Sequence, residues 1–250
     1  MTLQTTYTWS HAIDDSTSTY QQNRGGVDGN FNLSRWRATA DLNRTHIVQI
    51  NYVYDIPLFK KSSPLLKGAL GGWEISGIAS FFTGQPVDFN RTPKGFSTGI
   101  GTSARCDNVG TVAVHKQIAD EPGYGPTLLW WDPGTVAMPL ASELLANNEP
   151  CMFGCMGRNI LTGPGRNNWD MALLKNFELP WFKAEHSTLQ FRWETFNTFN
   201  HTQYQYVNNG CNGDTPFGVA CGSGNGNDSN GFVNPVWAPR IMQFGLKFIF

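Results

Sequence analysis

Charge is scarce in this sequence, and long hydrophobic runs are absent from it. Charged residues make up 15% of the 250 residues. No apolar run approaches the roughly 18 residues that a membrane-spanning helix requires, which excludes a helical membrane protein. The formal net charge of -1, from 18 basic and 19 acidic residues spread along the chain, leaves no basic patch of the kind that binds nucleic acid.

The amino terminus lacks the features of an export signal. Residues 1–10 alternate in polarity, whereas a signal peptide has a charged region, an apolar stretch and a cleavage site. We therefore expect either a cytoplasmic protein or a fragment of a longer exported one. The sequence is instead rich in turn-forming and aromatic residues, with 27 Gly, 14 Pro and 13% aromatic residues. This composition favours strands and long irregular connections over exposed helices.

Cysteine is rare as well, with five residues in the chain. All five lie in Gly- and Asn-rich loop sequence, which suits an oxidising compartment. We predict two possible local disulfides, between Cys151 and Cys155 and between Cys211 and Cys221, each of which would pin a loop. Cys106 is then left without an assigned partner.

Alternation with a period of two residues is the dominant pattern. It is present in six segments, close in length to the roughly 9 to 11 residues that a tilted strand needs to cross a bilayer. The segments are residues 3–10, 47–56, 73–82, 169–177, 189–195 and 242–250. Such alternation predicts strands with one apolar and one polar face, in a membrane barrel and in a soluble sandwich alike.

The connections between these segments favour the barrel. They span residues 12–45, 57–72, 84–167, 179–187 and 200–239. If the strands run alternately up and down, every long connection falls on one side, as in outer-membrane barrels with short periplasmic turns and long external loops. We therefore predict an all-β fold, an antiparallel transmembrane β-barrel segment of about six long strands, with 84–167 as a long extracellular loop. The barrel is incomplete, because even the smallest closed ones use about eight strands.

The predicted faces assign side chains to the lumen or to the lipid. Glu74, Arg192 and Glu194 fall on the polar face and are candidates to face the lumen. Lys175 falls on the apolar face near the periplasmic end, where its stem can reach the interface. Aromatic residues cluster near strand ends, as expected at lipid headgroups. They are Tyr7, Trp9, Tyr52, Tyr54, Trp73, Phe81, Trp169, Phe177 and Phe199.

The last eight residues, QFGLKFIF, fit the terminal assembly signal of outer-membrane barrels. Gln243 and Gly245 are its polar and small positions, and Phe248 and Phe250 are its outward aromatic positions. An exposed strand edge with aromatic residues at fixed positions can serve as a template to which another strand adds in one register. We therefore expect the barrel-assembly machinery as a partner.

Six blocks that cover nearly the whole chain resemble successive blocks of the barrels of Oar-like TonB-dependent receptors. They are YTWSHAIDD from Tyr7, NRTHIVQINYVYDIP from Asn43, GGWEISGIASFFTGQP from Gly71, GRNILTGPGRNNWDMALLKNF from Gly157, LQFRWETFNTFNHTQ from Leu189 and APRIMQFGLKFIF from Ala238. The resemblance implies energised uptake across the outer membrane of a Gram-negative bacterium. It also implies a barrel surrounded by outer-membrane lipid and served by the TonB complex.

The same resemblance implies that much of the family's architecture lies outside these residues. Its amino-terminal carboxypeptidase-regulatory-like domain, its plug and its TonB box have no counterpart here, and its barrels close with 22 strands. We therefore expect residues 1–250 to be the carboxyl-terminal portion of one outer-membrane barrel domain. The transported substrate is left open.

We predict no enzyme, no cofactor and no metal site. Residues 95–99 match the G-x-S-x-G pattern of hydrolases, but the flanking sequence offers neither the strand nor the helix that a nucleophile elbow requires. Residues 222–226, GSGNG, likewise lack the strand and helix of a phosphate cradle. A zinc site needs four ligands, and His115 is the sole upstream loop histidine near Cys151 and Cys155.

Two alternatives to transport follow from the same residues. The first is a secreted or surface β-sandwich that binds glycans through aromatic loop residues such as Trp130 and Trp131. It predicts a soluble monomer in which Phe248 and Phe250 are buried. The second is a nonfunctional truncated remnant.

Overall fold

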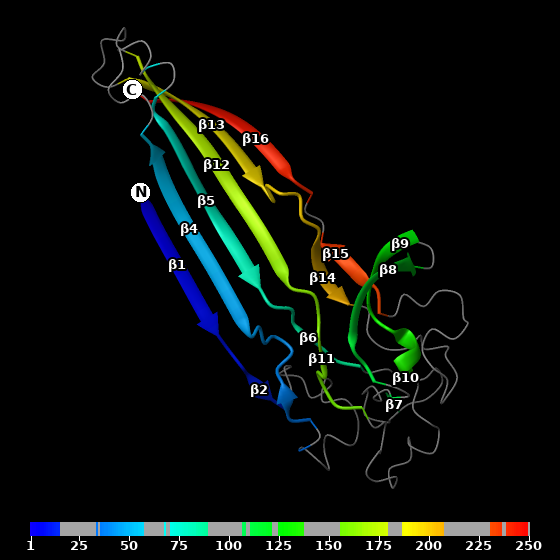
Figure 1. Ribbon diagram of the computed structural model, residues 1–250. Helices are drawn as coiled ribbons and strands as arrows, with labels where there is room; N and C mark the ends of the chain where they lie inside the picture. Colours follow the sequence, from blue (N-terminus) through cyan, green and yellow to red (C-terminus); the bar gives the residue numbers. More distant parts are fainter. Residues whose placement is uncertain are drawn as a thin grey trace, which may run out of the picture.

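The fold is described from a computed structural model (Figure 1). The structure describes residues 1–15, 34, 36–57, 68, 71–89, 107–108, 111–121, 125–137, 156–179, 187–207, 231–236 and 239–249. Its largest element is a six-stranded antiparallel sheet in the order β1-β4-β5-β12-β13-β16. The strands are β1 (Thr2–Trp9), β4 (His46–Ile56), β5 (Trp73–Phe82), β12 (Arg166–Glu178), β13 (Thr188–Phe196) and β16 (Ile241–Ile249). These are the six predicted segments, in chain order across the sheet.

The register places residues of like character opposite one another. On one face, Leu173 of β12 lies between Ile75 of β5 and Trp193 of β13. On the other face, Asn176 of β12 lies opposite Gln190 of β13, whose Nε2 donates a hydrogen bond of 2.9 Å to Asn176 Oδ1. A shift by one residue would exchange the two faces, so the alternation in the sequence fixes this register. We call the two sides the apolar face and the polar face.

The three long connections leave the sheet at one end. The strand ends that meet there are Trp9 with His46, Phe82 with Arg166, and Phe196 with Ile241. At the opposite end, the shorter connections join Ile56 to Trp73 and Glu178 to Thr188. We call these the cap end and the turn end. In Figure 1 the short strands gather beside the cap end of the sheet, and the predicted asymmetry of the connections is confirmed.

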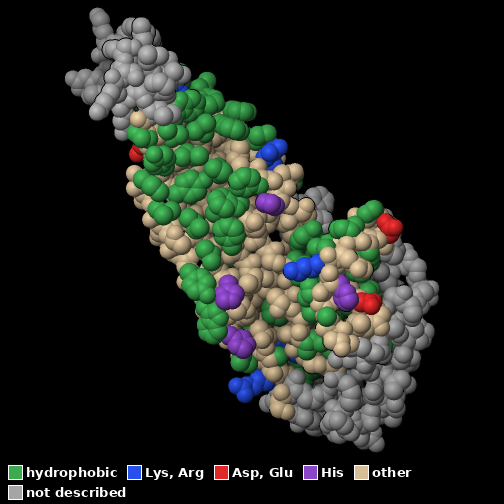
Figure 2. All heavy atoms as spheres, in the orientation of Figure 1, with side chains coloured by type: hydrophobic (Ala, Val, Ile, Leu, Met, Phe, Trp, Pro, Cys, Tyr) green, Lys and Arg blue, Asp and Glu red, His purple; other side chains and the backbone are tan. Residues whose placement is uncertain are grey.

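Among the described residues, no further strand or sheet covers the apolar face or either edge of the sheet. Figure 2 shows hydrophobic side chains spread across the visible face of the six-stranded sheet. β1 and β16 are the edges of the sheet, which is not closed. Phe248 of β16 is 43% exposed, whereas the sandwich alternative predicted that it would be buried. That prediction is wrong, because no second sheet of described residues covers this face.

The described parts of the long connections form a cap of short strands. These pair as β2 (Ile13–Asp14) with β3 (Ala38–Thr39), β6 (Pro86–Val87) with β11 (Leu161–Thr162), β7 (Asp107–Asn108) with β10 (Val136–Ala137), β8 (Val114–Glu121) with β9 (Gly125–Trp131), and β14 (Gln203–Val207) with β15 (Val233–Val236). A 3-10 turn, η3 (Pro133–Thr135), also belongs to the described cap. The described parts of the segment predicted as a long loop, 84–167, therefore contain the short strands β6 to β11.

No helix in the described ranges is long and apolar enough to span a membrane.

The cap has a hydrophobic core of its own. Phe89 packs edge-on against Trp131, with ring centroids 4.8 Å apart. The neighbouring Trp130 donates its indole N–H to the carbonyl of Thr162 at 2.8 Å. This cap core consists of Val87, Phe89, Trp130, Trp131, Val136, Met156, Leu161, Val207 and Val233. Trp130 and Trp131 are 7% and 0% exposed, so the prediction that they form a glycan-binding surface is wrong.

Two glycines let the sheet pass into the cap at the junction of β5 and β12. Gly84 follows β5, and a Cβ added to it would lie 1.8 Å from the carbonyl oxygen of Gly163. The N–H of Gly163 donates to the carbonyl of Gln85 at 2.8 Å, which continues the ladder toward β6 and β11. The two backbones can approach this closely because Gly84 has no side chain.

We predict that Gly84→Ala destabilises the junction by at least about 2 kcal/mol, because a methyl group there must displace backbone. Limited proteolysis of the purified folded protein should cleave the cap faster in this variant. Gly134→Ala is the matched control, since its Cβ would meet only the flexible side chain of Asp132, at 3.2 Å. Equal cleavage rates for the two variants would contradict the prediction.

Candidate functional site on the polar face

The polar face brings the three predicted lumen residues together. Glu74 of β5 lies opposite Leu174 of β12, which lies opposite Arg192 of β13. Glu194 is two residues further along β13, so its side chain leaves the sheet on the same side as Arg192. The three charged residues therefore share one face, the side opposite the hydrophobic one.

Glu194 joins the last two strands through its side chain. Arg192 Nη2 donates to Glu194 Oε1, and Gln243 Nε2 of β16 donates to Glu194 Oε2. Glu194 and Gln243 lie directly opposite in the register, which makes the second contact possible. Both carboxylate oxygens of Glu194 therefore accept a hydrogen bond, and the negative charge of Glu194 balances the positive charge of Arg192. Such a partly exposed pair contributes modestly to stability, but it fixes two side chains in position.

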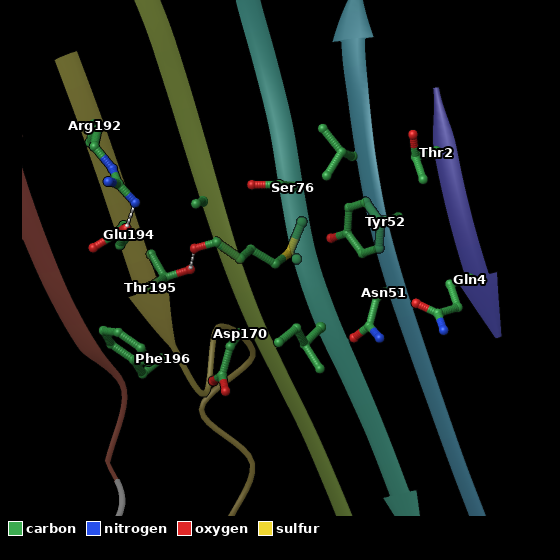
Figure 3. Close-up of a pocket in the computed structure, with 15 residues that line it drawn as sticks. Thr2, Gln4, Asn51, Tyr52, Ser76, Asp170, Arg192, Glu194, Thr195 and Phe196 are labelled. Carbon is green, nitrogen blue, oxygen red and sulfur yellow. Dashed lines mark hydrogen bonds and ion pairs between the residues drawn. The ribbon is translucent and has the colours of Figure 1, made fainter. Parts of the chain in front are cut away.

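A hollow of about 600 Å³ lies on this face (Figure 3). Its polar lining comes from five strands, and the close-up shows Arg192 and Glu194 on one side and Thr2 and Gln4 on the other. The lining residues are Thr2, Gln4, Asn51, Tyr52, Val53, Ser76, Gly77, Ile78, Asp170, Met171, Ala172, Arg192, Glu194, Thr195 and Phe196. Amide, hydroxyl and carboxylate groups of this kind can hold water or a polar solute by hydrogen bonds.

Asp170 in this hollow also has a structural task. Its Oδ1 accepts a hydrogen bond of 2.9 Å from the N–H of Asn197, just after β13. The next N–H, that of Thr198, donates to the carbonyl of Trp169 at 2.8 Å. Asn197 has a φ of 51°, a left-handed conformation that Asn tolerates better than most residues. Asp170 thus fixes the point at which the chain leaves β13 for the cap.

Aromatic rings mark the cap end of the apolar face. Trp169 packs edge-on against Phe81 and Phe199, each with a centroid distance of 5.6 Å. Tyr7 and His46 stack nearby at 6.1 Å, and the tyrosine hydroxyl lies 2.9 Å from His46 Nδ1. These rings lie where the aromatic pattern predicted an interface.

Lys175 on the apolar face has its charge compensated at the turn end. Its side chain lies between Trp73 and Phe177, with Nζ 5.0 Å and 4.8 Å from the two ring centroids. Nζ donates to the carbonyl of Gly71 at 2.6 Å, and the residue is 2% exposed. Cation–π contacts and a backbone acceptor thus replace the water that an ammonium group normally requires.

An arginine in the cap forms a polar cluster that the sequence did not predict. Arg158 Nη1 donates to Asp14 Oδ1 at 2.5 Å, and its Nη2 donates to Asp41 Oδ1 at 2.7 Å. Arg158 Nη1 also reaches the carbonyl of Trp36 at 3.3 Å, and Asn159 Nδ2 donates to Asp41 Oδ1 at 2.5 Å. The cluster ties the connection after β1 to the segment just before β11.

The electrostatics of this cluster favour the charged guanidinium. Burial acts to lower the pKa of Arg158, but hydrogen bonds and charge from Asp14 and Asp41 outweigh it and raise the pKa overall. Arg44, at the cap end of β4, shows the opposite balance. Burial and then the positive charge of Arg166 lower its pKa, and Nη1 of Arg44 donates to the carbonyl of Thr83 at 2.7 Å.

The assembly-signal residues divide between the two faces of β16. Gly245 lies opposite Arg192 and Gln243 opposite Glu194 on the polar face, whereas Phe248 lies opposite Leu189 on the apolar face. Phe250 lies outside the described residues, as do Cys106, Cys151, Cys155, Cys211 and Cys221. Within the described ranges, no group of three or more His, Cys, Asp or Glu residues is placed to hold a metal ion.

An open sheet of long alternating strands, with a hydrophobic outer side and a charged inner side, defines a barrel-type membrane protein. The family model for an outer membrane beta barrel domain matches residues 1–243. The chain belongs to this family, and its location is the outer membrane of a Gram-negative bacterium. Searches of curated proteins and of solved structures found no match.

We predict that Arg158→Gln loosens the cap, because it removes the guanidinium that joins Asp14 to Asp41. Removing one partner of a buried ion pair costs about 3 to 5 kcal/mol of folding stability. We expect about 3 kcal/mol here, because Asp41 is partly exposed. Protease added to intact cells should cleave the cap on the order of 100 times faster, if cleavage follows the population of the opened state. Arg37→Gln is the control, since Arg37 is exposed. Unchanged cleavage of Arg158→Gln would show that the cluster does not hold the cap.

Proposed function

We propose that this chain forms the carboxyl-terminal part of the barrel of an Oar-like TonB-dependent receptor, which takes up a solute across the outer membrane. The sequence blocks that resemble that family support the proposal. The single observation that carries it is the open sheet in a protein of the outer membrane. Among the described residues, no strand pairs with the outer side of either edge strand, β1 or β16.

The physical argument concerns those edges. In hydrocarbon, each unsatisfied backbone N–H or C=O costs several kcal/mol, so spanning sheets close into barrels. Six strands are fewer than the roughly eight of the smallest barrels, whereas outer-membrane transporters use about 22. Further strands of a longer chain would close this sheet and complete the polar hollow into a lumen.

The proposal assigns a partner to each surface. Outer-membrane lipid covers the apolar face, and the barrel-assembly machinery pairs with β16 during insertion. The TonB complex acts through an amino-terminal plug and TonB box that lie outside these 250 residues. The cap forms the cell-surface entrance, and the hollow with Arg192 and Glu194 faces the solute path. We propose no catalysis, because uptake of this kind moves a solute without changing it chemically.

The test measures the mass of the protein in the membrane and its binding to TonB. Outer membranes of the source organism would be solubilised and passed over the immobilised periplasmic domain of TonB, then blotted with an antibody against residues 241–249. We expect a band much heavier than 27.8 kDa that TonB retains and an unrelated periplasmic protein on the same resin does not.

The other outcomes separate the alternatives. A membrane band at 27.8 kDa would overturn the proposal in favour of a small or oligomeric barrel. A heavy band that TonB does not retain would overturn TonB dependence and leave the barrel standing. Absence of the protein from membranes of cells that transcribe the gene would support a nonfunctional remnant.

A further inference from the structure

A groove of about 220 Å³ lies on the apolar face, near the cap end of β13 and β16. Its floor is hydrophobic, and Trp193 in it stacks on Phe244 with the two rings 10° from parallel. The lining residues are Ile75, Met171, Ala172, Leu173, Trp193, Thr195, Thr198, Arg240 and Met242. The groove therefore combines a largely apolar lining with one cationic residue, Arg240, which immediately precedes β16.

Two hydrogen bonds hold Arg240 at the cap end of β16. Its N–H donates to Asn200 Oδ1 at 3.0 Å, and its Nη1 donates to the carbonyl of Thr198 at 3.4 Å. Thr198 is itself bonded to Trp169, the centre of the aromatic group at the cap end. In outer-membrane barrels the end with the long connections is external, so Arg240 lies at the outer leaflet.

The charge of Arg240 is available, unlike that of Arg158 and Arg192. Arg158 is bound by Asp14 and Asp41, and Arg192 is paired with Glu194. Arg240 is exposed and makes no ion pair with any residue that the structure describes. Its guanidinium has five donors, and one long contact to a carbonyl leaves most of them free for an anion.

We infer that this groove binds one lipopolysaccharide molecule of the outer leaflet, with an acyl chain over Trp193 and Met242 and a phosphate of the lipid headgroup on Arg240. The largely hydrophobic lining fits a hydrocarbon chain. An arginine fork fits a phosphate oxygen pair better than a lysine would. The inference depends on the outer-membrane location and not on TonB dependence, so either can fail without the other.

The test measures lipid binding to the protein purified from outer membranes in detergent and freed of bound lipid. Native mass spectrometry would follow titration with lipopolysaccharide, with its dephosphorylated form and with phosphatidylglycerol. We expect Arg240→Gln to weaken binding of intact lipopolysaccharide about tenfold, the effect of losing one charge-assisted contact. The dephosphorylated form should bind the unaltered protein equally weakly, which tests the phosphate contact without any substitution.

Two further variants define the site. Met242→Trp fills the groove and should weaken binding of both the phosphorylated and the dephosphorylated lipid. Arg166→Gln removes an exposed arginine at the same end but on the polar face, and should leave binding unchanged. Folding of each variant is checked by its mobility on gels with and without heating. Three outcomes would each overturn the inference. Arg240→Gln could bind lipopolysaccharide as tightly as the unaltered protein, Arg166→Gln could lose as much affinity as Arg240→Gln, or phosphatidylglycerol could bind as tightly as lipopolysaccharide.

Discussion

Backbone hydrogen bonding in hydrocarbon is the constraint on which the rest of this structure depends. A chain that crosses a membrane as strands must pair every N–H and C=O with another strand. β4, β5, β12 and β13 have a partner on each side, and β1 and β16 have a partner on one side. Because the partners are antiparallel and adjacent in sequence, the connections fall alternately at the two ends. The cap at one end and the two shorter turns at the other follow from that arrangement.

The same constraint explains why the sheet could be predicted and the cap could not. A strand between lipid and a wet interior has one environment on each face, so its side chains alternate and the register follows. Glu74 and Arg192 could be placed on one face from this alone, whereas the contact of Glu194 with Gln243 required the register of β13 and β16. In the cap no repeating environment exists. Arg158 meets Asp14 across 144 residues, and no local pattern signals that contact.

Tryptophan shows how far composition can mislead outside a periodic segment. Trp130 and Trp131 stand in loop-like sequence between Pro-containing turns, and a pair of adjacent aromatic residues there suggests an exposed binding surface. The structure buries both, because β9 and β10 supply a shared core with β6, β11, β14 and β15. Long-range packing of this kind depends on which strands meet, and the spacing of residues within one strand contains no information about it.

The arginine and lysine side chains differ in which groups compensate their positive charge, according to where each lies in the fold. In the polar face Arg192 is balanced by a neighbour on its own strand, and in the cap Arg158 is enclosed by two carboxylates. On the apolar face Lys175 is enclosed by rings and a carbonyl at the turn end. Arg240 stands on that face at the other end, without an anion among the described residues.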